Sequence, residues 1–293
     1  MISGQSSRTA EYMAFFRALE SVRSMDKRLF DDPFAISFLR PGLRKAVYWS
    51  KHRPLRAAIN WYVDKRMPGA RTSAIARTRL IDDRLREALG AGIRQVVILG
   101  AGFDCRSLRL PEINSAVVFE VDHRDTLRAK RDCLDRIAWS ARSSVRYVGI
   151  DFNRESLSNA LNNAGFDKSL PTVFLWEGVT NYLTEETVDS VLNVIATCQV
   201  KSQIIFTFVH SGVLDGSTSF HGADRLIRDV ADVGEPWTFG IDPQNLPAFL
   251  SQRGFQLDED LSADDYRTRY FGAWARRIKG YGFYHVAVAR VAA

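Results

Sequence analysis

The sequence predicts an α/β fold: a seven-stranded, mostly parallel sheet with an antiparallel last strand, a helical N-terminal extension and a lid insert. An apolar run at 95–99 ends in a glycine turn, as a buried parallel strand does when it enters a tight loop. Further apolar runs alternate with helical patterns, at 116–121, 145–150, 172–176 and 203–209. A late pair of strand patterns, at 255–257 and 281–291, departs from this alternation and indicates the antiparallel strand.

The first 70 residues contain no strand pattern and are expected to form the helical extension. Apolar residues recur at helical spacing in 8–23. Asp32 followed by Pro33 has the composition of a helix start, with the aspartate as N-cap. A third, aromatic-rich helix is expected over 43–63, until a Met-Pro-Gly sequence at 67–69 breaks it. The aromatic residues suit either the wall of a hydrophobic pocket or packing against the sheet, and both interpretations stay open.

Helices are also expected between and after the strands. The helix over 71–90 should bury one apolar side, formed by Ile75, Leu80, Ile81, Leu85 and Leu89. A second helix over 125–141 should connect two strands, and Thr184 should cap the helix that follows the fourth strand. Residues 212–240, rich in Gly, Ser, Asp and aromatic residues, are typical of a lid with one helix near 224–232. A last helix is expected over 244–253.

We expect a single domain, because no low-complexity linker and no internal repeat interrupts residues 1–293. It should comprise four regions, namely the helical extension at 1–70, a core at 71–210, the lid insert at 211–253 and closing strands at 254–293.

Composition argues against several classes of protein. No apolar run is long enough to span a membrane, and charged residues near the N-terminus argue against a signal peptide. Cys105, Cys133 and Cys198 form no C-x-x-C pair, so we expect no metal site and a cytoplasmic location. The net charge of +6 comes mostly from arginines interleaved with acidic residues, and the basic clusters lack a stripe of stacking aromatic residues. We therefore expect neither a nucleic-acid nor a membrane partner, and the oligomeric state stays open.

The glycine turn after the first strand has the features of a nucleotide-binding loop. Gly100 and Gly102 allow a sharp bend and a close approach of the backbone to a ligand, because neither has a Cβ. Asp122 lies 22 residues after Gly100, at the end of the next strand. A carboxylate there can accept hydrogen bonds from both hydroxyls of a ribose. The core should therefore bind an adenosine-containing cofactor.

The identity of that cofactor follows from the residues of the turn. A dinucleotide site needs a third glycine where this chain has Cys105, and Asp104 would repel a pyrophosphate. An acid suits the ammonium and sulfonium of S-adenosylmethionine instead. At the end of the third strand, Asp151 and Phe152 offer a hydrogen bond and a ring surface to an adenine. S-adenosylmethionine is favoured, with dinucleotide binding as the alternative.

Together these segments resemble the leucine carboxyl methyltransferase superfamily, and most closely its bacterial branch of polyketide-associated, S-adenosylmethionine-dependent O-methyltransferases. The residues that carry the resemblance are 96–104 with Arg106, 120–122, 151–152, 177–183, 31–33, 77–79, 234–237 and 269–270. The resemblance implies the Rossmann-like fold of class I methyltransferases.

The resemblance also implies roles for individual residues. Arg77 should pair with the cofactor carboxylate, and Glu177 should lie near the amino group or the sulfonium. The two glycines should line the methionine portion, Asp122 should hold the ribose, and Asp151 with Phe152 should hold the adenine. The complete expected cofactor set is Arg77, Gly100, Ala101, Gly102, Asp104, Asp122, His123, Asp151, Phe152 and Glu177.

The expected reaction is methyl transfer to an oxygen of a small, largely apolar acceptor. A carboxylate needs positioning more than a base, and positioning can supply roughly 7–11 kcal/mol of the barrier. A phenol would benefit from a base, for which His210 and Tyr182 are candidates. The expected substrate pocket contains Tyr12, Phe16, Tyr182, His210, Phe220, His221 and Trp237. A protein C-terminal carboxyl group as acceptor, or cofactor binding without catalysis, are the alternatives.

Rival enzyme classes lack their motifs. The fourth strand leads into Glu177-Gly178-Val179-Thr180 and not into the Asn/Asp-Pro-Pro-aromatic turn of enzymes that methylate exocyclic nitrogens. No Pro-Cys pair is present for attack on cytosine C6, and no Gly-x-Ser-x-Gly for serine hydrolysis.

Overall fold

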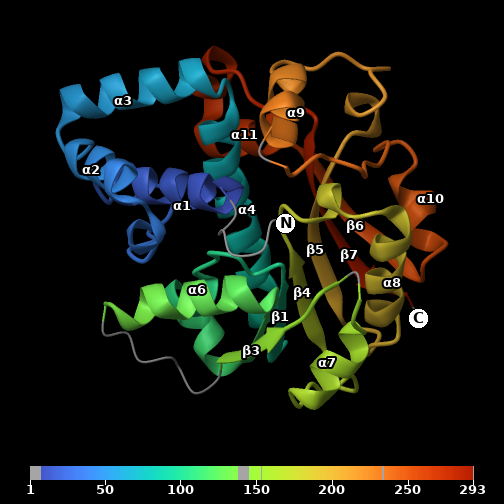
Figure 1. Cartoon of the computed structure of the whole chain (residues 1–293). Coiled ribbons are helices and arrows are strands. Elements are labelled where there is room, and N and C mark those ends of the chain that lie inside the picture. The colour runs from blue at the N-terminus through green and yellow to red at the C-terminus, as the bar shows by residue number, and fades with distance from the viewer. Residues whose placement is uncertain (1–7, 138–144, 153, 233, 293) are drawn as a thin grey trace.

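The computed structural model describes residues 8–137, 145–152, 154–232 and 234–292. Its centre is a seven-stranded sheet with the strand order β3-β2-β1-β4-β5-β7-β6 (Figure 1). Strands β1 to β5 are parallel, and β7 runs antiparallel to both of its neighbours, β5 and β6. This confirms the predicted sheet. The strands are β1 Gln95–Leu99, β2 Val117–Asp122, β3 Val145–Gly149, β4 Thr172–Trp176, β5 Gln203–Val209, β6 Phe255–Ser262 and β7 Tyr284–Val291.

Helices cover both faces of the sheet (Figure 1). They are α1 Arg8–Ser21, α2 Pro41–Trp49, α3 Arg53–Arg66, α4 Ala70–Gly90, α5 Arg106–Arg109, α6 Arg124–Asp135, α7 Leu157–Asn163, α8 Glu185–Ala196, α9 Ala223–Asp232, α10 Leu246–Ser251 and α11 Ala263–Phe271. In the described part of the chain, none of them combines the length and the apolar character needed to cross a membrane.

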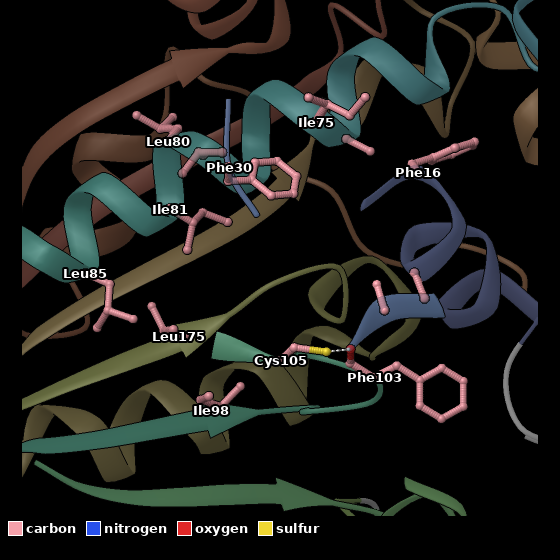
Figure 2. Packing of buried hydrophobic residues seen from close by; sticks show 14 of the residues in the cluster. Phe16, Phe30, Ile75, Leu80, Ile81, Leu85, Ile98, Phe103, Cys105 and Leu175 are labelled. Carbon is pink, nitrogen blue, oxygen red and sulfur yellow. Dashed lines mark hydrogen bonds between the residues drawn. The ribbon is translucent and has the colours of Figure 1, made fainter. Parts of the chain in front are cut away.

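Alternate residues of the buried strands supply two separate hydrophobic cores. Ile98 of β1 belongs to the core that includes α4, whereas Val97 belongs to the core that includes α7, α8 and α10. Figure 2 shows Ile75, Leu80 and Ile81 of α4 on the first of these faces. All five apolar positions predicted for the buried side of this helix are buried. The order of the strands reverses beside β1, so the carboxyl ends of β1 and β4 form the topological switch point where α/β proteins bind ligands.

The extension differs from the prediction in two places. Asp32 accepts a hydrogen bond from the Ala35 N–H at 3.0 Å, but only a short 3-10 helix follows, at Ala35–Phe38. Arg40 is extended because it precedes Pro41, which leaves no room for an α-helix. The helix expected over 43–63 is divided into α2 and α3, because Pro54 has no N–H for the helical ladder and is accommodated in the first turn of α3.

Later elements also deviate from their expected bounds. The helix expected over 125–141 ends at Asp135, and its positions 138–141 lie outside the described residues. The helix over 244–253 shortens to α10, and Gly254 with φ +81° follows it. The last strand begins at Tyr284 and not at Tyr281. Three helices, the short α5 together with α7 and α11, were not predicted.

Candidate cofactor and acceptor site

One cavity of about 790 Å³ lies at the carboxyl ends of β1, β2 and β4. All ten residues of the expected cofactor set line it. Of the expected substrate pocket, Tyr12, Tyr182 and Trp237 line it as well. Phe16, His210, Phe220 and His221 do not line this cavity. The cofactor residues are thus brought together, whereas the expected substrate pocket is only partly assembled.

The glycine turn is held open by its packing. Gly100 has φ +66°, and a Cβ at this position would lie 2.3 Å from Cγ2 of Val179. The N–H groups of Gly100 and Ala101 both donate to the Val121 carbonyl, at 2.8 and 3.1 Å, which fixes the turn to the end of β2. Only glycine fits this conformation and this space, so the backbone at the end of β1 stays accessible from the cavity.

Asp122 is buried and oriented by the backbone around it. Its Oδ2 accepts a hydrogen bond from the Gly102 N–H and its Oδ1 accepts one from the His123 N–H, both at 2.6 Å. Burial raises the pKa of Asp122, and these two N–H donors offset part of that effect. Each carboxylate oxygen keeps a second lone pair, so the residue can still accept two ribose hydroxyls.

Glu177, at the end of β4, lies between two arginines. Its Oε1 accepts from Arg77 Nε and its Oε2 from Arg106 Nη1, both at 2.8 Å. Burial by itself raises the pKa of Glu177, but the guanidinium groups of Arg106 and then Arg77 outweigh it and lower the pKa below its usual value. The carboxylate is therefore ionised at neutral pH and suits a cationic ligand group.

Arg77 is positioned to bind an anion while it holds Glu177. The side chain, 8% exposed, lies with its Cζ 4.9 Å from the centre of the Tyr284 ring. Its Nε is used by Glu177 and its Nη2 makes a weak contact of 3.5 Å with Sδ of Met13. A guanidinium has five N–H groups, so further donors remain for a carboxylate.

The donor set therefore fits S-adenosylmethionine. The cavity offers carboxylates for the cationic groups, an arginine for the carboxylate and Asp122 for the ribose. Phe152, partly buried beside Asp151, offers a ring to the adenine.

The sequence did not indicate how these residues connect to the N-terminal extension. Arg106 Nε bonds to Asp82 Oδ1 at 2.8 Å, and Arg109 bonds to the same oxygen at 2.7 Å. Asp32 lies next in this chain of charges, 3.8 Å from Arg109 and 2.8 Å from Arg17. Arg17 also donates to the Phe103 carbonyl in the glycine turn, at 2.5 Å. These contacts connect helix α1 to the glycine turn. In the sequence of the extension, the Asp-Pro pair at 32–33 is the only part of this network that stands out.

His210, one of the two candidate bases, does not line the cavity. Its Nδ1 accepts from the Gly212 N–H at 3.0 Å, and its ring centre lies 5.2 Å from that of Phe220. The residue thus ends β5 and starts a short 3-10 helix. Tyr182 does line the cavity, but burial raises its pKa, so its hydroxyl is protonated at neutral pH and donates hydrogen bonds better than it accepts a proton.

The lid contacts both the extension and the core over the cavity. Thr9 Oγ1 of α1 donates to Glu235 at 2.7 Å. Thr238 donates through its N–H to the Asn181 carbonyl and through its hydroxyl to the Leu183 carbonyl, both at 2.8 Å. The segment between these two anchors therefore closes one side of the cavity.

Comparison with known proteins identifies the family. A family model described as leucine carboxyl methyltransferase matches residues 10–196. Proteins named as S-adenosyl-L-methionine-dependent methyltransferases are similar to the chain: one from Frankia alni is 36% identical over 184 residues, which are 63% of this chain and 62% of that protein. Another, from Mycolicibacterium smegmatis, is 30% identical over 281 residues, which are 88% of this chain and 90% of that protein.

A solved structure from Thermobifida fusca, named as a methyltransferase, has the same fold. Its TM-score is 0.60 at 17% identity, and the match covers 99% of this chain and 100% of that one. The strand order, the residues gathered at the switch point and the family match agree with one another. The chain therefore belongs to the leucine carboxyl methyltransferase family and is an S-adenosylmethionine-dependent methyltransferase.

Proposed function

We propose that the protein methylates an oxygen, by preference a carboxylate, of a small and largely apolar acceptor. The observation that carries this proposal is the lining of the cavity beyond the cofactor set. It combines apolar side chains with arginines and with the carboxylates of Asp229, Asp232 and Glu235, and among the described lining residues the only histidine is His123. That histidine caps α6 beside the expected ribose, where its Nδ1 accepts from the Asp125 N–H at 3.3 Å.

Apolar side chains from three helices support a largely apolar acceptor. Met13 comes from α1, Ala70 and Ala74 from the start of α4, and Leu226 and Val230 from α9. Such a lining with a few convergent polar groups is typical of small-molecule sites.

A carboxylate is favoured over a phenol because it needs no base, and among the described lining residues His123 is the only histidine. The other candidate bases on the acceptor side are the carboxylates of Asp229, Asp232 and Glu235, and Glu235 already accepts a hydrogen bond from Thr9. When bound, S-adenosylmethionine supplies an electrophilic methyl group, and a carboxylate already carries the charged oxygen. Tyr182 is a neutral hydroxyl, so it can orient the acceptor but is a poor base. Arg66 and Arg8 also line the cavity and provide positive charge for an anionic acceptor.

The remaining contribution of the chain is positioning and the exclusion of water. Pre-alignment can supply roughly 7–11 kcal/mol, enough to account for a large part of the acceleration. The contact between Thr9 and Glu235 and the anchors of Thr238 hold α1 and the lid over the cavity. A cytoplasmic location is part of the proposal and is supported by the free thiols of Cys105, Cys133 and Cys198.

The test is a panel of small carboxylic acids and phenols, incubated with the protein and isotopically labelled S-adenosylmethionine and analysed by mass spectrometry. We expect methyl esters of apolar acids as the main products. Methylation of a protein C-terminus but of no small molecule would overturn the proposal, and so would tight cofactor binding without turnover of any acceptor.

A further inference from the structure

Helices α2 and α3, residues 41–66, form a unit that packs little against the rest of the protein. Val47 is the only buried residue of α2, and Val63 is the only one of α3. Figure 1 shows both helices at the periphery of the molecule, away from the sheet. We refer to residues 41–66 as the α2–α3 unit.

Large apolar side chains gather on the exposed side of this unit. The unit supplies five of the ten exposed large hydrophobic residues of the described chain, with relative exposures between 46% and 64%. They are Tyr48, Trp49, Leu55, Trp61 and Tyr62. The sequence leaves two roles open for the aromatic residues of this region, namely forming the wall of a pocket or packing against the sheet. The four aromatic residues of the list have neither role in the structure, because their side chains are exposed.

The unit also carries the entire net charge of the protein. The chain has 40 basic and 34 acidic residues. Seven of the basic residues but only one acidic residue lie in residues 41–66, so the rest of the chain has 33 basic and 33 acidic residues. The single acid, Asp64, is paired with Arg71 of α4 at 2.6 Å. None of the seven basic residues forms an ion pair with an acidic residue in the described part of the chain. Ion pairs therefore do not neutralise this positive charge, although Asp26 lies near enough to Arg53 for the guanidinium to help lower the pKa of that carboxyl.

Basic and aromatic side chains alternate on this surface. Nζ of Lys51 lies 5.3 Å from the centre of the Tyr48 ring, and Nζ of Lys65 lies 5.1 Å from that of Trp61. Interfacial helices have this composition, because aromatic residues enter the headgroup region of a bilayer while lysine and arginine contact anionic lipids.

We propose that the α2–α3 unit binds the surface of a membrane that contains anionic phospholipids. The exposed Leu55, Ala57 and Ala58 favour lipid over single-stranded nucleic acid, because aliphatic side chains gain from an apolar phase but offer no ring for a base to stack on. A second copy of the chain is disfavoured, because two faces of charge +6 would repel each other. The expectation of no membrane partner rested on the absence of a spanning segment, which peripheral binding does not require. The expectation that no aromatic residues accompany the basic clusters is wrong for this unit, where Lys51 and Lys65 lie over the exposed rings of Tyr48 and Trp61.

The position of the unit connects it with the cavity. Arg66, the last residue of α3, and Met67 line the cavity, so the exposed surface lies beside it. An apolar acceptor dissolved in the bilayer would thus be available near the site. This connection, unlike the membrane surface itself, rests on the function proposed above.

Vesicle flotation tests the charge. The protein should float with vesicles of phosphatidylcholine mixed with phosphatidylglycerol, remain behind with phosphatidylcholine alone, and be released by salt. The triple variant Lys45→Glu, Lys51→Glu and Lys65→Glu should lose on the order of a hundred-fold in partitioning. The control, Arg128→Glu, Lys168→Glu and Lys201→Glu, changes three exposed residues elsewhere by the same charge and should retain more binding. Unchanged melting temperatures establish that both variants fold.

Leu55→Ser and Leu170→Ser test the apolar contribution, because both leucines are 46% exposed but only Leu55 lies on the unit. Leu55→Ser should weaken vesicle binding more than Leu170→Ser does. In a separate measurement, vesicles should shift the tryptophan emission of the protein to the blue, and this shift should be lost when Trp49 and Trp61 are replaced by Phe. Equal losses in both triple variants would overturn the proposal. Absence of vesicle binding would also overturn the proposal. This holds whether or not the unit is then found to bind single-stranded DNA or to mediate self-association. Vesicle binding without methylation of any small acceptor would instead contradict the proposed function alone.

Discussion

At the scale of single residues, Arg106 has the most demanding environment in the site. Its side chain is 3% exposed and bonds to Asp82, Asp104 and Glu177 at 2.8, 2.5 and 2.8 Å. Removing it would leave three carboxylates without their shared cation. We expect Arg106→Met to lower the free energy of unfolding by about 3–5 kcal/mol, measured by chemical denaturation. The control Arg290→Met breaks a bridge to Asp258 in which Arg290 is 49% exposed, and it should cost less than about 1 kcal/mol.

Arg77 allows a second prediction at this scale. If its guanidinium binds the cofactor carboxylate, Lys cannot reproduce the paired N–H groups. Arg77→Lys should weaken the binding of S-adenosylhomocysteine about tenfold or more, as the loss of a charged hydrogen bond implies. Arg79→Lys is the matched control, because Arg79 lies on the same helix but bonds to Asp83. Titration calorimetry decides, and equal affinities for the Arg77 variant and the parent would contradict the role.

At the scale of elements, alanine substitutions at two glycines separate the cost of backbone strain from the cost of a steric clash in the turn after β1. Gly100 and Gly216 both have positive φ, +66° and +73°, but a Cβ on Gly216 would meet no atom within 4 Å. Gly216→Ala should therefore cost only about 1–2 kcal/mol of stability from its left-handed conformation. Gly100→Ala should cost roughly 1–3 kcal/mol more because of Val179, and should also weaken cofactor binding. Equal melting temperatures of the two variants would show that Val179 moves aside freely.

Elements that are buried on both faces were the easiest to predict. The strands at 172–176 and 203–209 have the predicted bounds, because short apolar runs rich in β-branched and aromatic residues favour strands that are buried on both faces. By contrast, β6 alternates with polar residues such as Asp258 and Asp260 and extends well beyond the three residues expected. The sequence does carry a signal for α7, because Leu157, Ala160 and Leu161 recur at helical spacing, but over only two turns. In α11 the buried side includes Arg267 beside Ala263 and Tyr266, so its apolar pattern is interrupted by a charged residue.

The same distinction applies to the site. The cofactor side follows from local features, namely the glycine turn and the acids at strand ends such as Asp122, and all its expected residues line the cavity. The acceptor side is assembled from α1, α4, α9 and the lid, which no local pattern brings together. Phe16 shares the helical spacing of Tyr12 yet is fully buried in the core, and His210 forms a backbone cap. Sequence alone therefore could not separate pocket residues from packing residues.

At the scale of the whole molecule, the paired carboxylates couple stability to pH. Burial raises the pKa of Asp104, but the Arg106 guanidinium outweighs this and lowers it from 3.8 to about 2. The pKa of Glu177 is also lowered from 4.5 despite burial, through Arg106 and Arg77. Both groups add stability above their unfolded pKa values and lose it as the pH falls through the folded ones. Asp122, whose burial raises its pKa, acts in the opposite sense.

We therefore expect the free energy of unfolding to be constant above about pH 5 with respect to these groups and to fall below about pH 4.5. Denaturation curves measured between pH 3 and pH 7 in the parent and in Arg106→Met check this, because the variant should lose most of the acid-dependent decline. An identical slope in both proteins would assign the decline to other carboxylates.

The pH dependence of turnover distinguishes the two classes of acceptor. A carboxylate is ionised from about pH 5 upward, so the rate with a carboxylic acid should be constant from there to about pH 9. A phenol without a base should react about tenfold faster for each pH unit up to its pKa near 10. Tyr182, whose pKa is raised by burial, stays protonated over this range. Tyr182→Phe should therefore leave the shape of the pH profile unchanged, whatever its effect on the size of the rate. Initial rates with the acceptor found in the panel decide: a flat profile supports the carboxylate, and a profile that rises steadily toward pH 10 assigns the reaction to a phenol.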